Sequence, residues 1–173
     1  MTAVLVVMAG RAGTGKSTLA KLLVTQLRGV YIRLDAIVLG MLDAALTDDV
    51  PRAAGIGYDI AQEVARENLE LGVPVVVDGI HATHERREGW RDIAASCGAQ
   101  IRYVETYLAD EAEHRRRVEA RTSGGVAYPG PAWEAIQEMP YEAWDETRSG
   151  ERLAVDMSDA DKALASAVSY VRM

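Results

Sequence analysis

The sequence predicts an α/β fold in which a parallel five-stranded sheet is covered by helices on both faces. Segments rich in β-branched residues alternate with segments of helical periodicity along all 173 residues. One of them, residues 73–77, is almost entirely valine, which is typical of a strand buried on both faces. Ligands of such sheets bind beyond the carboxyl ends of the strands, so polar residues that follow strands are the candidates for a site.

The first part of the chain contains two predicted strands, each followed by a helix. Residues 3–8 are an apolar, β-rich run that ends shortly before Gly10. Residues 15–27 carry leucines at helical spacing. A short strand over residues 30–34 leads into a helical segment over residues 36–46.

The middle of the chain opens with a loop and then repeats the alternation. Residues 47–57 mix polar residues with glycine and proline, which predicts a loop. A helix over residues 60–71, closed by a glycine, precedes the valine strand. A helix over residues 87–97 and a strand over residues 101–108 follow.

The last part of the chain completes the sheet. A helix over residues 110–121 is followed by a loop over residues 122–131 that is rich in glycine and proline. A short strand over residues 152–155 and an amphipathic helix over residues 160–171 close the chain. We expect one domain over residues 1–173, with a helical lid at about 110–131.

Composition narrows the classes of partner. The formal net charge of −7 argues against binding of long nucleic acids, which relies on many lysines and arginines. No apolar run approaches the ~20 residues of a membrane span, so no membrane partner is expected. The single cysteine, Cys97, excludes an internal disulfide and favours a cytoplasmic protein. A homodimer is left open.

Residues 10–17 match the pattern Gly-x-x-x-x-Gly-Lys-Ser/Thr of a phosphate-binding loop, between a predicted strand and a predicted helix. Such a loop points backbone N–H groups at phosphates, and the helix N-terminus adds its positive dipole. Lys16 would reach the β- and γ-phosphates, and the Ser17 hydroxyl would bind Mg²⁺. The expected ligand is ATP with Mg²⁺, held by the residues Gly10, Arg11, Ala12, Gly13, Thr14, Gly15, Lys16, Ser17 and Thr18.

Two aspartates follow predicted strands and would meet this loop. Asp35 could accept the proton of a hydroxyl that attacks the γ-phosphate, or it could cap the helix that starts at Ala36; we favour catalysis. Asp78 could hold Mg²⁺ through water or orient the substrate. The chain has no Asn-Lys-x-Asp segment for reading guanine and no strand that ends in Asp-Glu, which argues against GTPases and hydrolytic ATPases.

Arginines and histidines supply further candidates. Arg117 and Arg121 lie four residues apart, hence on one helix face, and suit a lid that neutralises charge on the transferred phosphoryl group. His81 and His84 are too few for a closed zinc site, so a contact with the substrate or a surface position is expected.

Together these residues resemble the small P-loop kinases grouped with polynucleotide kinases, chloramphenicol phosphotransferase and zeta-toxin-like proteins. The resemblance also includes Tyr58-Asp59, Glu85-Arg86-Arg87 and Val155-Asp156-Met157-Ser158, and spans nearly the whole chain. It implies a three-layer α/β/α fold with strand order 2-3-1-4-5 and transfer of the ATP γ-phosphate to a hydroxyl. It further implies Asp35 as the base and the lid arginines near the nucleotide. The expected acceptor contacts are Asp35, Asp78, His81 and Arg87.

The sequence departs from polynucleotide kinases on the acceptor side. Their arginine three residues after the aspartate is replaced by Val38, within an apolar stretch that runs from Ile37 to Leu42. The segment after the third strand is Gly79-Ile80-His81 in place of the usual pattern. We therefore expect a kinase for a small molecule, such as an antibiotic or a nucleoside. The alternatives are a polynucleotide 5′-hydroxyl kinase and an ATP-binding regulatory module without an acceptor.

Overall fold

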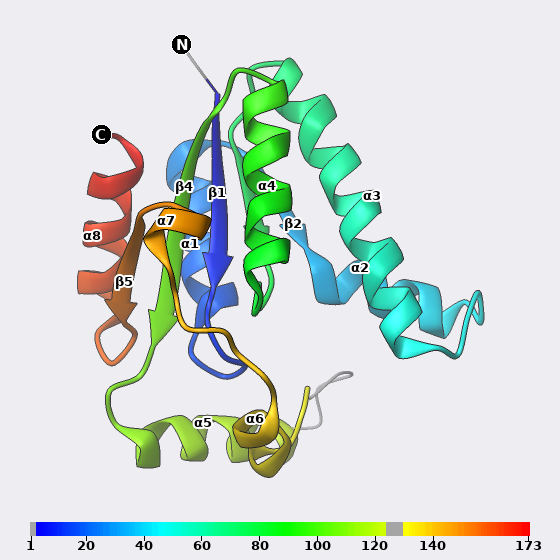
Figure 1. The fold of residues 1–173 in the computed structure, drawn as a ribbon. Helices are drawn as coiled ribbons and strands as arrows, with labels where there is room; N and C mark the ends of the chain where they lie inside the picture. Colours follow the sequence, from blue (N-terminus) through cyan, green and yellow to red (C-terminus); the bar gives the residue numbers. More distant parts are fainter. Residues whose placement is uncertain (1–2, 124–129) are drawn as a thin grey trace.

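The computed structural model describes residues 3–123 and 130–173 and shows a five-stranded parallel sheet (Figure 1). The strand order is β2-β3-β1-β4-β5, which confirms the expected order. Every neighbouring pair is parallel, with Leu5 opposite Val75 and Ile101 in the centre of the sheet. The strands are β1 (Val4–Ala9), β2 (Val30–Arg33), β3 (Val75–Asp78), β4 (Gln100–Tyr107) and β5 (Arg152–Asp156).

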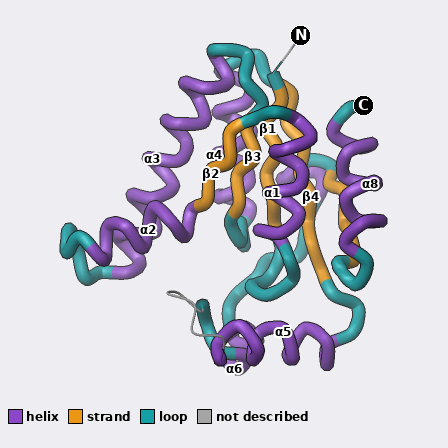
Figure 2. Tube along the Cα trace, turned by 180° about the vertical axis from the view of Figure 1, so that it is seen from behind, coloured by secondary structure: helices purple, strands orange, loops and turns teal. Residues whose placement is uncertain are grey.

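Helices connect the strands and cover both faces of the sheet. In chain order they are α1 (Lys16–Leu27), α2 (Leu34–Asp43), α3 (Val50–Glu70), α4 (His84–Ser96), α5 (Glu111–Ser123), α6 (Trp133–Glu138), α7 (Glu146–Ser149) and α8 (Ala160–Val171). Helices α1 and α8 lie on one face, in front of the sheet in Figure 2, and α3 and α4 lie on the other. None of the helices in the described residues is long and apolar enough to cross a membrane.

Strand β1 lies at the centre of the hydrophobic core and is buried on both faces. Leu5 and Val7 pack against α3 and α4, whereas Val6 and Met8 pack against α1 and α8. All four side chains are fully buried. An uninterrupted apolar strand is therefore required here, and it ends at Ala9, where the chain leaves the sheet and the polar site begins.

The predicted loop over residues 47–57 is wrong, because α3 begins at Val50 and includes most of that segment. Pro51 lies in the first turn, where its missing N–H costs nothing, and the Asp49 carboxylate accepts the Arg52 N–H at 3.0 Å as an N-cap. Gly57 lies within the helix because α2 packs closely there. A Cβ at that position would lie 2.9 Å from Cγ2 of Val38.

Two short helices were not predicted, and α4 begins earlier than expected. Helix α4 starts at His84 because the Thr83 hydroxyl caps it by accepting the Arg86 N–H at 3.3 Å. Helices α6 and α7 are too short to show periodicity in the sequence. Most of the predicted loop over residues 122–131, namely 124–129, lies outside the described residues.

Helices α5 and α6 lie beyond the carboxyl ends of the strands, at the bottom of Figure 1. Helix α5 follows β4 and passes beneath the loop between β1 and α1 in that view. The described part of the expected lid is thus placed against the edge of the sheet where parallel α/β proteins bind ligands.

Candidate active site

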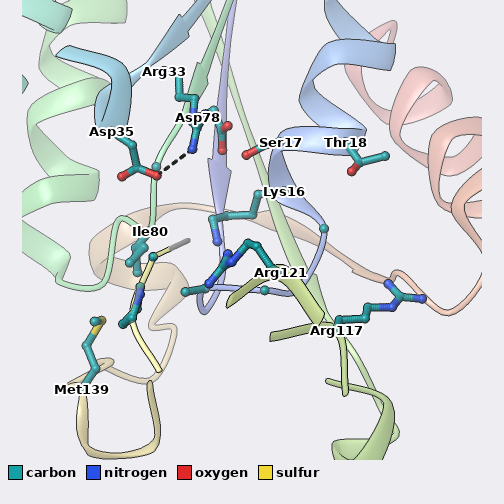
Figure 3. Close-up of a pocket in the computed structure, with 16 residues that line it drawn as sticks. Lys16, Ser17, Thr18, Arg33, Asp35, Asp78, Ile80, Arg117, Arg121 and Met139 are labelled. Atoms are coloured by element: carbon teal, nitrogen blue, oxygen red, sulfur yellow. Dashed lines mark hydrogen bonds and ion pairs between the residues drawn. The ribbon is translucent and has the colours of Figure 1, made fainter. Parts of the chain in front are cut away.

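A cavity of about 580 Å³ lies between the carboxyl ends of the strands and helix α5 (Figure 3). Residues from the loop after β1, from the ends of β2 and β3 and from the lid line it together. The lining residues are Ala12, Gly13, Gly15, Lys16, Ser17, Thr18, Arg33, Asp35, Asp78, Gly79, Ile80, Arg117, Arg121, Gly130, Pro131 and Met139. Its volume is in the range of small-molecule sites.

The loop from Gly10 to Gly15 needs glycine because it is pressed between β4 and α5. Gly10 has a φ of 124°, and a Cβ there would lie 2.3 Å from the carbonyl oxygen of Thr106. Gly13 has a φ of 83°, and its Cβ would lie 2.5 Å from Cγ2 of Val118 in α5. Larger residues would push the loop away from both neighbours.

Lys16, the first residue of α1, brings a positive charge into an enclosed position. Its side chain is buried, and Nζ donates a hydrogen bond to the carbonyl oxygen of Arg11 at 2.7 Å. Burial lowers the pKa of Lys16 from 10.5 to about 8, although the carboxylates of Asp78 and Asp35 oppose the shift. A polyanion bound in the loop would raise the pKa of this group again and stabilise its charge.

Two polar side chains of the loop brace it from outside the cavity. Arg11 donates from one terminal nitrogen to the carbonyl oxygens of Ile136 and Met139, at 2.7 and 3.1 Å. Thr14 donates to the Arg11 carbonyl at 2.9 Å and lies 2.7 Å from the hydroxyl of Thr106. These two residues can therefore offer the ligand their backbone rather than their side chains.

Asp35 lies in the first turn of α2 with its carboxylate at the cavity. The N-cap position of α2 is Arg33, so Asp35 does not cap the helix. Arg33 lies 3.4 Å from Oδ2 of Asp35 and forms an ion pair with it, drawn as the dashed line in Figure 3. The Asp35 side chain is 54% exposed, which leaves the carboxylate accessible to a ligand in the cavity.

Ser17 and Asp78 approach each other at the junction of α1 and β3. Their side chains point toward one another in Figure 3, and Asp78 is only 3% exposed. The hydroxyl of Tyr31, from β2, donates to Oδ2 of Asp78 at 2.6 Å. Burial, followed by the hydrogen bond to Asp78, raises the pKa of Tyr31.

The oxygen ligands in this corner fit Mg²⁺. The described residues contain no group of three or more His, Cys, Asp or Glu side chains that could enclose a metal ion. Mg²⁺ does not require one, because it commonly uses one or two protein oxygens together with phosphate oxygens and water. Ser17 and Asp78 match that requirement.

The two lid arginines line the same cavity but point to different parts of it. Arg121 extends toward Lys16 in Figure 3, and its charge helps to lower the pKa of that lysine. Arg117 points away from Lys16. Its Nε donates to Glu113 at 2.6 Å, and a terminal nitrogen donates to the carbonyl oxygen of Met157 at 3.1 Å. Arg121 therefore lies beside the lysine of the phosphate loop, and Arg117 lies on the side of the cavity near the β5–α8 turn.

His81 was expected to contact the acceptor, and the structure corrects that role. The side chain is fully buried and packs edge-on against the rings of Tyr58 and Trp90. Nδ1 lies 2.7 Å from the carbonyl oxygen of Met8, so Nδ1 must carry the proton and donate it. Burial lowers the pKa of His81 to about 4, which keeps the ring neutral.

Arg87 is also buried and does not line the cavity, which corrects the second acceptor contact. Its Nε donates to the carbonyl oxygen of His81 at 2.9 Å, and a terminal nitrogen donates to that of Glu142 at 3.0 Å. The guanidinium lies 4.4 Å from the ring centre of Trp144. Arg87 thus fastens the segment after α6 to the turn after β3.

His84 likewise takes a structural position. It is buried, and Nδ1 lies 2.8 Å from the hydroxyl of Ser149, whose side chain has no exposed surface. Neither the substrate contact nor the surface position expected from the sequence is observed.

Several residues at the cavity were not identified from the sequence. Tyr31 and Arg33 are two positions apart in β2, which places both on the sheet face covered by α1; this spacing could have indicated them. Ile80 and Met139 line the same cavity, on the side of Asp35 rather than of Arg117. His114 lies outside the cavity but holds the loop, because Nε2 donates to the carbonyl oxygen of Ala12 at 2.7 Å. No local pattern indicates such contacts between distant segments.

The sheet order and the loop between β1 and α1 define the P-loop kinase fold. The chain belongs to the AAA domain family, whose model matches residues 5–149. Comparison with curated proteins gives no significant match.

Solved structures with this fold include several kinases. APS kinase CysC from Mycobacterium tuberculosis, in complex with AMPPNP and APS, is 20% identical with a TM-score of 0.68, covering 99% of both chains. A gluconokinase from Sinorhizobium meliloti is 20% identical with a TM-score of 0.64, covering 99% of this chain and 92% of its own. Kti12 from Chaetomium thermophilum, in complex with ADP-AlF3, is 15% identical with a TM-score of 0.73, covering 96% of this chain and 98% of its own.

Proposed function

We propose that this protein is an ATP- and Mg²⁺-dependent kinase that transfers the γ-phosphoryl group to a hydroxyl of a small molecule. The proposal rests on one observation. Lys16 and Ser17 of the phosphate loop, Asp35 and Asp78 at two strand ends, and Arg121 of the lid line a single cavity. The same cavity thus offers a phosphate-binding loop, a candidate general base and a positive charge for the transferred phosphoryl group.

The phosphates of ATP would lie in the loop, where the N–H groups at the start of α1 and the ammonium of Lys16 face them. Arg121 extends toward Lys16 and would neutralise charge on the γ-phosphoryl group as it moves. Arg117 would lie nearer the nucleoside, since it is held toward Met157. Each of these groups acts by position and charge.

Asp35 would serve as the general base. The acceptor hydroxyl gives its proton to the carboxylate while its oxygen forms a bond to the γ-phosphorus. The bond from that phosphorus to the β–γ bridging oxygen breaks, and ADP leaves. Arg33, which forms an ion pair with Asp35, would orient the carboxylate toward the hydroxyl.

Ser17 and Asp78 would hold Mg²⁺ at the other side of the phosphates. When bound, the ion supplies charge neutralisation to the β- and γ-phosphate oxygens. The chain contributes the hydroxyl of Ser17 and the nearly buried carboxylate of Asp78, both directed to the same corner.

A small acceptor fits the site better than a nucleic acid. The net charge of −7 disfavours a long polyanion, and Ile80 and Met139 contribute apolar groups to the cavity that Asp35 lines. The fold relatives named for gluconate and for APS are consistent with a small acceptor without identifying it. Transfer to a polynucleotide 5′-hydroxyl remains the second candidate, and a short oligonucleotide in the acceptor panel tests it.

The decisive variant is Asp35→Asn. We expect it to bind ATP as the wild type does and to lose phosphotransfer by about 10²-fold or more, since a general base contributes that much. Asp43→Asn, at the last residue of the same helix, is the matched control and should keep full activity. Acceptors are first found by screening small alcohols, sugars and nucleosides for ADP release with the wild type. Equal turnover by Asp35→Asn and the wild type would exclude Asp35 as the base.

A further inference from the structure

The hydroxyl of Tyr31 lies between the two residues that fit Mg²⁺. It donates to Oδ2 of Asp78 at 2.6 Å, and the Ser17 side chain is close enough to the phenol to oppose the rise in the pKa of Tyr31. Tyr31 therefore joins the start of α1 to the end of β3 through one phenol. Sequence patterns assign it no role in binding phosphate or metal.

The position of the Tyr31 ring is fixed by the fold. Tyr31 is in the middle of β2, where it pairs with Val76 of β3. Its side chain is half-buried and packs against the cluster formed by α1, α8 and that face of the sheet. The ring cannot leave this place without disturbing the core, so the hydroxyl is presented to Asp78 and Ser17 before any ligand binds.

The chemistry of a hydroxyl ligand explains what such a phenol can do. A serine that offers a lone pair to a cation must send its proton elsewhere, and it needs an acceptor for that proton. The Tyr31 oxygen can accept from Ser17 while its own proton goes to Asp78. One carboxylate oxygen of Asp78 is then occupied, and the other is left for the ion or its water.

Two hydrogen bonds in series would thus form a relay from Ser17 through Tyr31 to Asp78.

We propose that Tyr31 is a positioning residue for Mg²⁺, which orients the Ser17 hydroxyl and the Asp78 carboxylate through its own hydroxyl. The inference rests on the proposed function to the extent that a nucleotide and Mg²⁺ share this site. It goes beyond that function because it assigns a part in metal affinity to a residue that would contact neither the nucleotide nor Mg²⁺ directly. Partners of this kind typically change metal affinity by about 10- to 100-fold.

The test compares Tyr31→Phe with the wild type by binding, without any acceptor. ADP affinity is measured by calorimetry in EDTA and in Mg²⁺, and Mn²⁺ affinity of the ADP complex is measured by electron paramagnetic resonance. We expect Tyr31→Phe to bind ADP normally in EDTA and to bind Mn²⁺ about 10- to 100-fold more weakly. Tyr170→Phe is the matched control, because its hydroxyl donates to the carbonyl oxygen of Glu151, at 3.4 Å, and does not line the cavity.

A double-mutant cycle separates the relay from a general effect on the site. In an Asp78→Asn background, Tyr31→Phe should weaken Mn²⁺ binding by much less than it does alone, because the two residues act on the same ligand. Undiminished loss in that background would overturn the inference.

Other outcomes are equally clear. Unchanged Mn²⁺ affinity in Tyr31→Phe would also overturn the inference. So would a loss of ADP affinity in EDTA as large as the loss of Mn²⁺ affinity, since that result indicates only a structural role. If the wild type binds no nucleotide at all, the proposed function fails instead. Should the variant not fold, the wild type still decides: the Tyr31 Cζ resonance of the ADP complex should shift when Mg²⁺ is added, and an unmoved resonance contradicts the relay.

Discussion

His81 shows how one buried residue can resemble a site residue in the sequence. It follows β3 by three positions, at the edge where ligands bind, and it is a residue type common in active sites. Its backbone has a φ of 48°, which turns the ring away from the cavity and under β1. The ring then serves the core, between Tyr58 and Trp90.

This placement predicts an acid-sensitive stability. The pKa of His81 is lowered from 6.5 to about 4 by burial, so below pH 6.5 the unfolded chain takes up a proton that the folded protein refuses. The stability that the neutral ring provides is complete above pH 6.5 and is lost as the pH falls toward 4. At pH 5 the loss is about 2 kcal/mol, from 1.4 kcal/mol per pH unit.

Urea unfolding of the wild type and of His81→Gln at pH 7 and pH 5 measures this loss. Glutamine keeps an N–H donor for Met8 and cannot gain a proton in this range. The variant should be less stable at pH 7 and should lose less stability than the wild type between the two pH values. Equal losses in both proteins would show that His81 is not the group that titrates.

At the scale of elements, the contact between α2 and α3 positions the candidate base. Asp35 lies at the start of α2, and the other end of that helix is held by Met41, which is buried. Gly57 of α3 lets Val38 approach closely, since a Cβ there would meet Cγ2 of Val38 at 2.9 Å. Gly55, on the same helix, has open space around it.

The pair of glycines gives a matched test. Gly57→Leu should push α2 away and destabilise the protein by about 1–3 kcal/mol, as overpacking does. Phosphotransfer should fall with the displacement of Asp35, whereas ADP affinity should persist because the phosphate loop is untouched. Gly55→Ala should be neutral or stabilising by about 0.5–1 kcal/mol. Thermal unfolding and ADP calorimetry measure both, and full activity in Gly57→Leu would contradict the role of this contact.

The elements also show which parts of the structure are predictable from the sequence. Helix α8 has the bounds expected from its periodicity, and the strands differ by one or two residues from expectation. The central strands β1 and β3 give the strongest apolar signal, because they are buried on both faces. The sequence does not indicate the start of α3, because its proline and glycines are also typical of loops. Here Pro51 is an N-terminal helix residue and Gly57 a packing contact.

Some residues of the candidate site are predictable from the sequence and others are not. Residues that follow strands or belong to the phosphate loop could be located, since the topology brings strand ends together. The burial of Arg87 and the bracing contact of His114 could not, because each depends on a segment far away in the chain. The strand order came from a family resemblance rather than from periodicity.

At the scale of the whole molecule, the phosphate loop connects the sheet to the lid. Arg11 holds the end of α6 through two carbonyl oxygens, and His114 of α5 holds the loop through Ala12. The ring of Trp133 in α6 packs edge-on against His114. The loop conformation and the described part of the lid are therefore one packed unit, and a ligand that orders the loop also stabilises the lid.

The buried charge of Lys16 makes this unit less stable without a ligand. The pKa of Lys16 is about 8 in the folded protein and 10.5 when solvated, so between these values the unfolded chain holds a proton that the folded one lacks. Stability at this residue is complete above pH 10.5 and is lost as the pH falls to 8. At neutral pH the cost is about 3 kcal/mol, from 1.4 kcal/mol per pH unit.

Removing the charge of Lys16 should therefore stabilise the ligand-free protein and weaken nucleotide binding. Lys16→Met removes that cost and loses one hydrogen bond worth about 1 kcal/mol, so the ligand-free protein should gain about 2 kcal/mol. For a chain of this size that gain raises Tm by about 4–8 °C. Mg²⁺ with ADP should raise the Tm of the wild type further and leave the variant unchanged, because only a bound ligand stabilises by mass action. Scanning calorimetry at pH 7 with and without ADP measures both effects, and a lower Tm for ligand-free Lys16→Met would mean that the lysine charge is not a net cost to the fold.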